Sequence, residues 1–271
     1  MSQPAEASRG AAGRTLLGIA VNTLPLAAQV ARAVRAIDEP ADAPFTFACA
    51  NPHSLVVARR DAYFRQCLRS CSSVVADGIG VKVAGFITGG QFGPRITGWD
   101  FFHATMSELD RRGGKAFFFG SRTEVLELLA KRAAGDYPGV RIETFSPPYG
   151  EWSEAENEAM LGRIRGFAPD ALWVGMTAPR QEKWMHANAL LTRAPVIGAI
   201  GAVFDYYAGT VRRAPSWICD AGLEWLYRLA GEPGRLWKRT VVSAPQFLWL
   251  VLRERFQPEA DVDGDSIAPA Q

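Results

Sequence analysis

The segment Ala76-Asp77-Gly78-Ile79-Gly80 contains the residue types best suited to chemistry. Asp77 follows a short apolar run, and the two glycines after it would let a ligand approach the backbone closely. A carboxylate at the end of a strand can take a proton from a reacting hydroxyl group as a general base. The same pattern also fits the N-cap of a helix, so the segment by itself leaves both interpretations open.

Further polar positions lie near the ends of other apolar runs. Gln181 and Lys183 belong to Ala178-Pro179-Arg180-Gln181-Glu182-Lys183-Trp184 and are expected near a ligand-binding edge. The glutamine amide can both donate to and accept from a sugar or a base, although a solvated first turn of a helix is the alternative. Asp205 could accept from a ribose hydroxyl or a uracil N–H, or cap a helix. Arg95 could bind a phosphate through two hydrogen bonds, or be a solvated loop arginine.

Short apolar runs alternate with helix-like segments between these positions. Apolar residues at helical spacing predict helices at Leu24–Ile37, Thr123–Ala134 and Ser153–Phe167. The expected strands are Thr15–Ala20, Phe45–Ala50, Ser73–Ala76, Ala116–Phe119, Val140–Phe145, Ala171–Val174 and Pro195–Ile200. This alternation predicts an α/β fold with a mostly parallel, Rossmann-like sheet covered by helices on both faces.

Glycines follow several of the expected strands, at Gly120, Gly175 and Gly201. Ligands bind at the carboxyl ends of the strands in such sheets, and N–H groups at the starts of the following helices suit a diphosphate. Gly120 and Gly175, like Gly78, are therefore candidate substrate-binding positions. Ordinary turns between strands and helices also use glycine, so both explanations stay open.

The character of the sequence changes after residue 208. From Thr210 to Arg255 there are eight basic residues, four acidic residues and four of the eight tryptophans. The expected organisation is a disordered leader (1–13), an α/β catalytic domain (14–208), a basic and aromatic helical appendage (209–256) and a disordered tail (257–271).

Within the appendage, the segment Phe247–Leu252 is apolar on every face and has basic neighbours. It is too short to span a bilayer, which takes about 20 apolar residues. A helix of this kind can lie in the headgroup region of a membrane, while packing against the sheet or against a second protomer is the alternative. The sequence shows no signal peptide and no apolar run long enough to span.

Several classes of function lack their signatures. The net charge of +2 argues against a nucleic-acid binder. The sequence has no dinucleotide-binding fingerprint after a strand and no P-loop. It also has no nucleophile elbow and only three histidines, so a serine hydrolase is poorly supported. The four cysteines have no metal-site or disulfide spacing, which indicates reduced thiols. No metal ligand set is expected.

Taken together, these segments resemble the WecG/TagA/CpsF glycosyltransferase family from about Leu16 to Arg239. Their order and spacing carry the resemblance more than any one segment does. They are Asn51-Pro52, Ala76–Gly80, Arg95-Ile96-Thr97-Gly98-Trp99-Asp100, Phe119-Gly120-Ser121, Ala178–Trp184, Gly201-Ala202-Val203-Phe204-Asp205, Arg212-Arg213-Ala214-Pro215 and Gly222-Leu223-Glu224-Trp225-Leu226-Tyr227-Arg228-Leu229.

The resemblance implies an inverting transfer of a sugar from a UDP-sugar donor to a polyprenyl-diphosphate-linked sugar, without a cofactor or a required metal. Asp77 would be the general base, and Arg95 a functional arginine. The remaining positions that the resemblance implicates in substrate binding are Asn51, Gln181, Asp205, Arg212, Arg213, Arg228 and Arg235. Such an enzyme would work at the cytoplasmic face of the plasma membrane, with its appendage touching the bilayer.

One position departs from the family pattern. Many members have a threonine two residues before the Asn that matches Asn51, and here that residue is Cys49. A thiol is a poor substitute for a hydroxyl group in binding a sugar, so the identity of the sugar stays open between an N-acetylmannosamine type and glucose.

Two other hypotheses accompany the glycosyltransferase. One is a nucleotide-dependent oxidoreductase on a similar sheet, and the other is a non-catalytic scaffold at the membrane surface. If the appendage is a separate unit, removing residues 210–271 should abolish turnover and leave the α/β body folded. A homo-oligomer could bury the aromatic surface of the appendage instead of a membrane.

Overall fold

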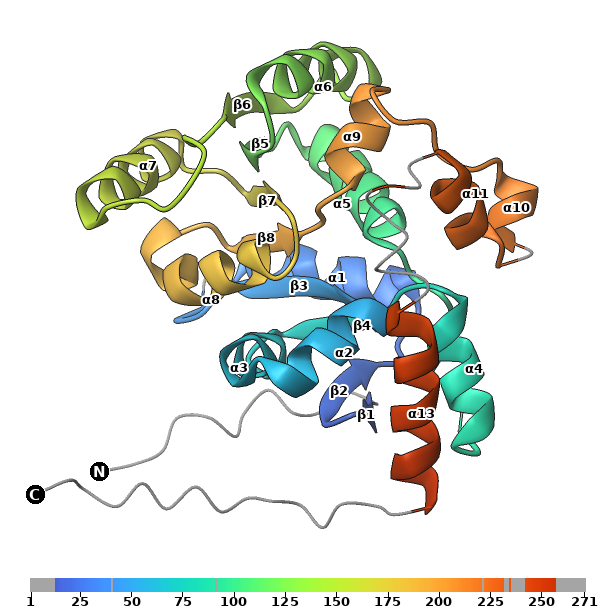
Figure 1. Ribbon diagram of the computed structural model, residues 1–271. Helices are drawn as coiled ribbons and strands as arrows, with labels where there is room; N and C mark the ends of the chain where they lie inside the picture. Colours follow the sequence, from blue (N-terminus) through green and yellow to red (C-terminus); the bar gives the residue numbers. More distant parts are fainter. Residues whose placement is uncertain are drawn as a thin grey trace, which may run out of the picture.

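The computed structural model describes residues 13–39, 41–90, 92–220, 222–231, 234 and 242–256. Within these residues the chain forms one eight-stranded sheet with helices on both faces (Figure 1). The strands are β1 (Gly13–Leu16), β2 (Ile19–Asn22), β3 (Phe45–Ala50), β4 (Ser73–Ala76), β5 (Lys115–Gly120), β6 (Arg141–Phe145), β7 (Ala171–Gly175) and β8 (Val196–Ala199).

The helices occupy most of the segments between the strands. The three helices predicted from apolar spacing are confirmed as α1, α6 and α7, and Ser153 and Glu156 form a capping box at the start of α7. The helices are α1 (Leu26–Asp38), α2 (Pro52–Arg60), α3 (Ala62–Arg69), α4 (Ile79–Ile87), α5 (Gly98–Arg112), α6 (Thr123–Asp136), α7 (Glu154–Phe167), α8 (Arg180–Thr192), α9 (Val203–Ala208), α10 (Ser216–Asp220), α11 (Glu224–Gly231) and α13 (Ser243–Phe256).

The strand order is β1-β2-β4-β3-β8-β7-β5-β6, and every neighbouring pair is parallel except β1 with β2. The predicted Rossmann-like α/β fold is confirmed. Since the parallel strands point the same way, the loops after β3, β4, β5, β7 and β8 gather at one edge of the sheet, where such folds bind ligands.

The first predicted strand is wrong as a single element. Residues of Thr15–Ala20 form a hairpin in which β1 pairs antiparallel with β2, and Gly13, assigned to the leader, already belongs to β1. The chain reverses at Leu17 and Gly18, with φ of 50° and 77°. Glycine adopts this left-handed backbone readily, but leucine rarely does, so the apolar pattern hid the turn.

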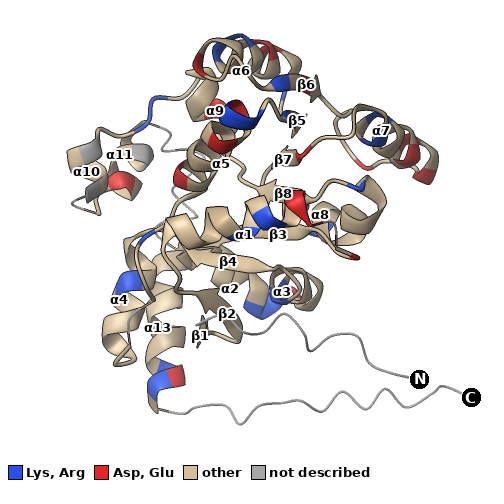
Figure 2. Ribbon diagram, turned by 180° about the vertical axis from the view of Figure 1, so that it is seen from behind, with Lys and Arg blue, Asp and Glu red and all other residues tan. Residues whose placement is uncertain are grey.

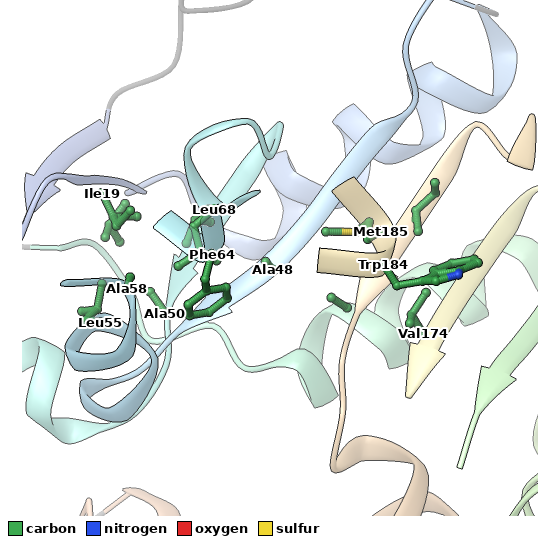
Figure 3. Close-up of a cluster of buried hydrophobic side chains, with 14 of the residues drawn as sticks. Ile19, Ala48, Ala50, Leu55, Ala58, Phe64, Leu68, Val174, Trp184 and Met185 are labelled. Carbon is green, nitrogen blue, oxygen red and sulfur yellow. The ribbon is translucent and has the colours of Figure 1, made fainter. Parts of the chain in front are cut away.

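The sheet separates two hydrophobic clusters. One lies between the sheet and α2, α3, α4, α7, α8 and α13, and Figure 3 shows part of it, with Phe64 and Leu68 of α3 and Trp184 and Met185 of α8. The other lies on the opposite face, under α1, α5, α6 and α9. Both faces of the sheet are therefore covered, and this explains why its central strands are apolar throughout.

The C-terminal segment is helical, as predicted, and its described helices are α10, α11 and α13. In α13, Phe247 and Val251 are buried in the first cluster, while Trp249 is 58% exposed. The helix is held at both ends, because His53 Nδ1 and Ser243 Oγ lie 2.9 Å apart and the Glu254 carboxylate accepts from the Leu17 N–H. The predicted leader, apart from residue 13, and the predicted tail lie outside the described residues.

Candidate active site

Asp77 lies directly after β4, and its backbone ties the ends of two strands together. Its N–H donates to the carbonyl of Ala50, the last residue of β3, at 2.9 Å. The next residue, Gly78, has φ of 88° and precedes α4. A side chain on Gly78 would meet no atom within 4 Å, so the backbone conformation explains this glycine and the space beside it is open.

Asn51 follows β3 and begins α2. Its side chain accepts from the N–H of Ser54 at 3.0 Å, and its own N–H donates to Ser54 Oγ at 2.9 Å. This capping box fixes the amide side chain at the carboxyl edge of the sheet, beside the loop that carries Asp77. Asn51 therefore caps a helix, and its Nδ2 group has no hydrogen-bond partner among the described residues.

Arg95 joins this edge to the C-terminal helices. Its guanidinium forms an ion pair with Glu224 of α11 and also donates to the carbonyl of Cys219 at 3.4 Å. Burial lowers the pKa of Arg95, but the carboxylates of Asp77 and Glu224 outweigh that effect and raise it overall. Asp77 and Arg95 are thus close enough for their charges to interact, although they come from different loops.

Cys49 near the end of β3 belongs to the same group. Burial raises the pKa of its thiol well above the usual value, and the negative charges of Asp77 and Glu182 add to this rise. The thiol is therefore neutral at physiological pH, and it offers no nucleophile to the site.

Gln181 lies beneath the loops that follow β7 and β8. Its Oε1 accepts from the Met176 N–H at 3.3 Å, and its Nε2 donates to the neighbouring Glu182 at 2.9 Å. Gly201 is so near that a Cβ there would lie 3.2 Å from Gln181 Oε1. The side chain is buried, and in this structure it ties the loop after β7 to α8 and packs beside Gly201 in the loop after β8.

The glycines at the ends of β5 and β7 are explained by packing. A Cβ on Gly175 would lie 2.4 Å from the Phe204 ring, and a Cβ on Gly120 would lie 2.6 Å from the Gly175 carbonyl oxygen. Gly120 also has φ of 117°. Close packing of other atoms of the chain therefore accounts for both glycines.

The structure does not bring Lys183 to this group. Its ammonium pairs with Asp61, at the start of α3, at 2.5 Å and lies 5.6 Å from the centre of the Tyr63 ring. The hydrogen bond from Lys183 lowers the pKa of Asp61. The expectation that Lys183 reaches the ligand-binding edge is wrong in this structure, because the helix turns it toward α3.

The remaining predicted positions follow β8. Asp205 lies in the short helix α9, where its backbone carbonyl accepts from Thr210 and Val211. Arg213 stacks over Trp99 of α5 with its guanidinium carbon 4.6 Å from the ring centre, and Arg212 is exposed. Arg228 belongs to α11, and Arg235 lies outside the described residues.

Two carboxylates at this edge were not predicted as functional residues. Glu224 pairs with Arg95, and its only signal in the sequence is its place in a segment that carries the family resemblance. Glu182 is buried, its Oε2 has no hydrogen-bond partner within the described part of the chain, and burial raises its pKa. Within the described residues, no three His, Cys, Asp or Glu side chains are placed to hold a metal ion.

Comparison with known proteins identifies the family. The model of the glycosyl transferase WecG/TagA/CpsF family matches residues 14–261. The chain belongs to this family of glycosyltransferases. The match begins at the second residue of β1 and extends past α13, so it includes the C-terminal helices α10, α11 and α13.

Three similar curated proteins share one name, N-acetylglucosaminyldiphosphoundecaprenol N-acetyl-beta-D-mannosaminyltransferase. The relative from Bacillus subtilis (strain 168) is 30% identical over 218 residues, which are 79% of this chain and 83% of that protein. The one from Bacillus spizizenii is 30% identical over 204 residues, 75% of this chain and 77% of its own. The one from Staphylococcus aureus (strain MW2) is 27% identical over 208 residues, which are 76% of this chain and 79% of that protein.

Proposed function

We propose that this enzyme transfers a sugar from a UDP-sugar to a sugar carried on polyprenyl diphosphate, in the synthesis of a cell-surface polysaccharide. The Asp77 carboxylate beside Arg95, at the carboxyl edge of the sheet in a member of this family, carries the proposal. The name of the relatives makes N-acetylmannosamine the first candidate for the transferred sugar and N-acetylglucosaminyl-diphospho-undecaprenol the first acceptor. Glucose is the second candidate for the sugar.

Asp77 acts as the general base of a single displacement. A hydroxyl group of the acceptor sugar attacks the anomeric carbon of the donor and gives its proton to the Asp77 carboxylate. The bond between that carbon and the diphosphate oxygen breaks as the new one forms, so the configuration inverts and UDP leaves. An aspartate is a weak base for an alcohol, and it works here because the proton leaves as the new bond forms.

The leaving UDP gains negative charge, which cationic side chains must stabilise. Arg95 is the first candidate, because its charge already interacts with that of Asp77. It would exchange its bond with Glu224 for one with the diphosphate, and guanidinium groups bind phosphate oxygens in pairs. Arg212, Arg213, Arg228 and Arg235 are the further candidates, and we propose that no metal ion is needed.

Polar groups around the same edge would hold the sugar and the nucleotide. The Nδ2 group of Asn51 can donate to a sugar oxygen, since helix capping uses only the Oδ1 atom. Asp205 would accept from the uracil or ribose, and Gln181 would hold the donor loop in place. Gly78 leaves open space beside Asp77 for the reacting groups.

The test is transfer from a panel of UDP-sugars to a synthetic N-acetylglucosaminyl-diphospholipid, with EDTA present. Asp77→Asn should lower the rate roughly 10²- to 10⁴-fold, the usual contribution of a general base. Asp42→Asn, an exposed aspartate in the loop before β3, is the matched control and should keep the wild-type rate. Wild-type turnover in Asp77→Asn would refute the base assignment, and turnover only without EDTA would refute metal independence.

We also propose that the protein is peripheral on the cytoplasmic face of the plasma membrane, where its C-terminal helices contact the bilayer. In the described residues no helix is long and apolar enough to cross a membrane. The outer side of α13 supports surface contact, because Trp249, Leu252 and Phe256 are 58%, 43% and 78% exposed. Tryptophan and basic residues are typical of helices that lie at the interface.

A further inference from the structure

Helix α4 of the α/β body has an exposed apolar side of its own. Ile79, Val83 and Phe86 are 39%, 39% and 89% exposed, and Lys82 lies among them. These positions are spaced as i, i+3, i+4 and i+7, so they form one stripe along the helix. The opposite side of α4, with Val81 and Ala84, is buried in the first hydrophobic cluster.

Helix α13 repeats this arrangement. Its outward residues are Leu248, Trp249, Leu252 and Phe256, and its inward residues Phe247 and Val251 belong to the same cluster as Val81 and Ala84. The two helices pack against one another and lie side by side in Figure 1. Since both bury their inner sides in one cluster, their exposed apolar stripes both face away from it.

The charges around these stripes are basic. Figure 2 shows α4 with basic and no acidic colouring, and the end of α13 with both. Lys82, Arg253 and Arg255 are exposed, whereas the Glu254 carboxylate accepts hydrogen bonds from the Leu17 N–H at 3.1 Å. An apolar surface with exposed lysine and arginine fits the anionic surface of a bilayer.

The position of α4 relates this surface to the chemistry. The helix begins at Ile79, two residues after Asp77. Ile79 also packs on the turn between α10 and α11, where a Cβ on Gly222 would lie 2.9 Å from its side chain. The amino end of α4 therefore lies at the candidate base, and its exposed stripe runs from there toward Phe86.

We infer that α4 and α13 together form the membrane-binding surface, so that the catalytic body itself docks on an anionic bilayer through Phe86 and its neighbours. The inference deepens the proposed function, which assigned membrane contact only to the C-terminal helices. It places the base at the end of a lipid-contacting helix, within reach of a diphosphate held at the headgroup level.

The test compares three serine substitutions of exposed apolar residues. They are Phe86→Ser on α4, Trp249→Ser on α13, and Leu190→Ser on α8 as the control, which is 65% exposed outside both stripes. Substitutions at exposed positions of this kind change the free energy of unfolding little. Binding is measured by sedimentation with vesicles of phosphatidylglycerol and phosphatidylethanolamine, and turnover with a polyprenyl acceptor in vesicles and with a short-chain, water-soluble acceptor.

We expect Phe86→Ser to weaken vesicle binding about tenfold or more, since binding scales with the apolar area buried. Its turnover should fall with the vesicle acceptor and stay unchanged with the soluble one, while Leu190→Ser should match the wild type in both. Loss of binding in Trp249→Ser alone would overturn the role of α4 and leave the proposed function standing. A dimer that Phe86→Ser dissociates, with vesicle binding unchanged, would assign the surface to a second copy and overturn the inference.

Discussion

Removing the C-terminal helix should unfold or severely destabilise the body, contrary to the expectation from the sequence. The perturbation is a chain that ends at Val242 and so lacks α13. Phe247 and Val251 are 1% and 0% exposed in the cluster that also contains the β3 and α2 side chains Ala50 and Leu55. Burying a side chain of either kind contributes about 1.5–3 kcal/mol, so their loss costs about 3–6 kcal/mol.

That loss is a large part of the total stability of a domain, which is about 5–15 kcal/mol. Unfolding in urea, followed by far-UV circular dichroism, should show a much lower midpoint for the shortened chain. The point variant Phe247→Ala should lose about 3–5 kcal/mol. Leu252→Ala, on the exposed side of the same helix, should lie within about 0.5 kcal/mol of the wild type.

An unchanged midpoint in Phe247→Ala would refute this reasoning, because it would mean that α13 does not pack on the body in solution. If the midpoint falls as expected, loss of turnover on truncation says nothing about diphosphate binding. The basic residues of the C-terminal segment then have to be tested one at a time.

Three further predictions follow from the charges and thiols near the site. Glu224→Gln removes the partner of Arg95 and should tighten inhibition by UDP up to about fivefold, the value of a partly exposed ion pair; an unchanged inhibition constant would argue that Arg95 does not bind the diphosphate. Burial raises the pKa of Glu182, so its neutral form favours the fold at low pH and that stability is lost as pH rises above about 4.5. As the pH rises from about 5 to about 8, the melting temperature of Glu182→Gln should therefore fall less than that of the wild type. Equal falls in both proteins would contradict a raised pKa of Glu182. Burial raises the pKa of Cys67 to about 11 and of Cys71 to about 12, so iodoacetamide should label both slowly at neutral pH unless the chain is unfolded, as mass spectrometry can measure.

The sequence predicted the sheet well where apolar runs are bounded by polar or turn residues. The ends of β3 and β4 match the prediction residue for residue, since Asn51 and Asp77 each stop an apolar run. The hairpin at Leu17 was missed because a leucine with positive φ has no signature in the sequence. Local sequence patterns therefore predicted most strands and helices. They failed where a residue adopts a backbone conformation that its type rarely takes.

Candidate site residues could be chosen one by one from the sequence, but the contacts between them could not. Asp77 could be singled out from its place after an apolar run. The contact of Arg95 with Glu224 joins residues 129 apart in sequence, and no local spacing indicates it. Gly175 was a candidate phosphate contact, whereas the structure explains it by the ring of Phe204. Tertiary contacts decide whether such a glycine packs against the protein, and local sequence does not show them. The catalytic role of each candidate residue stays a prediction.

The far edge of the sheet limits how copies of this protein could associate. Strand β6 pairs with β5 on one side only, and edge strands of this kind invite another strand to add. Here Arg163 of α7 pairs with Glu143 at 3.1 Å and lies over the ring of Phe145, and Arg141 is exposed. Charges along an edge disfavour its extension into a continuous sheet. A homo-oligomer should therefore not form by strand addition at β6, and aggregation through this edge should be suppressed.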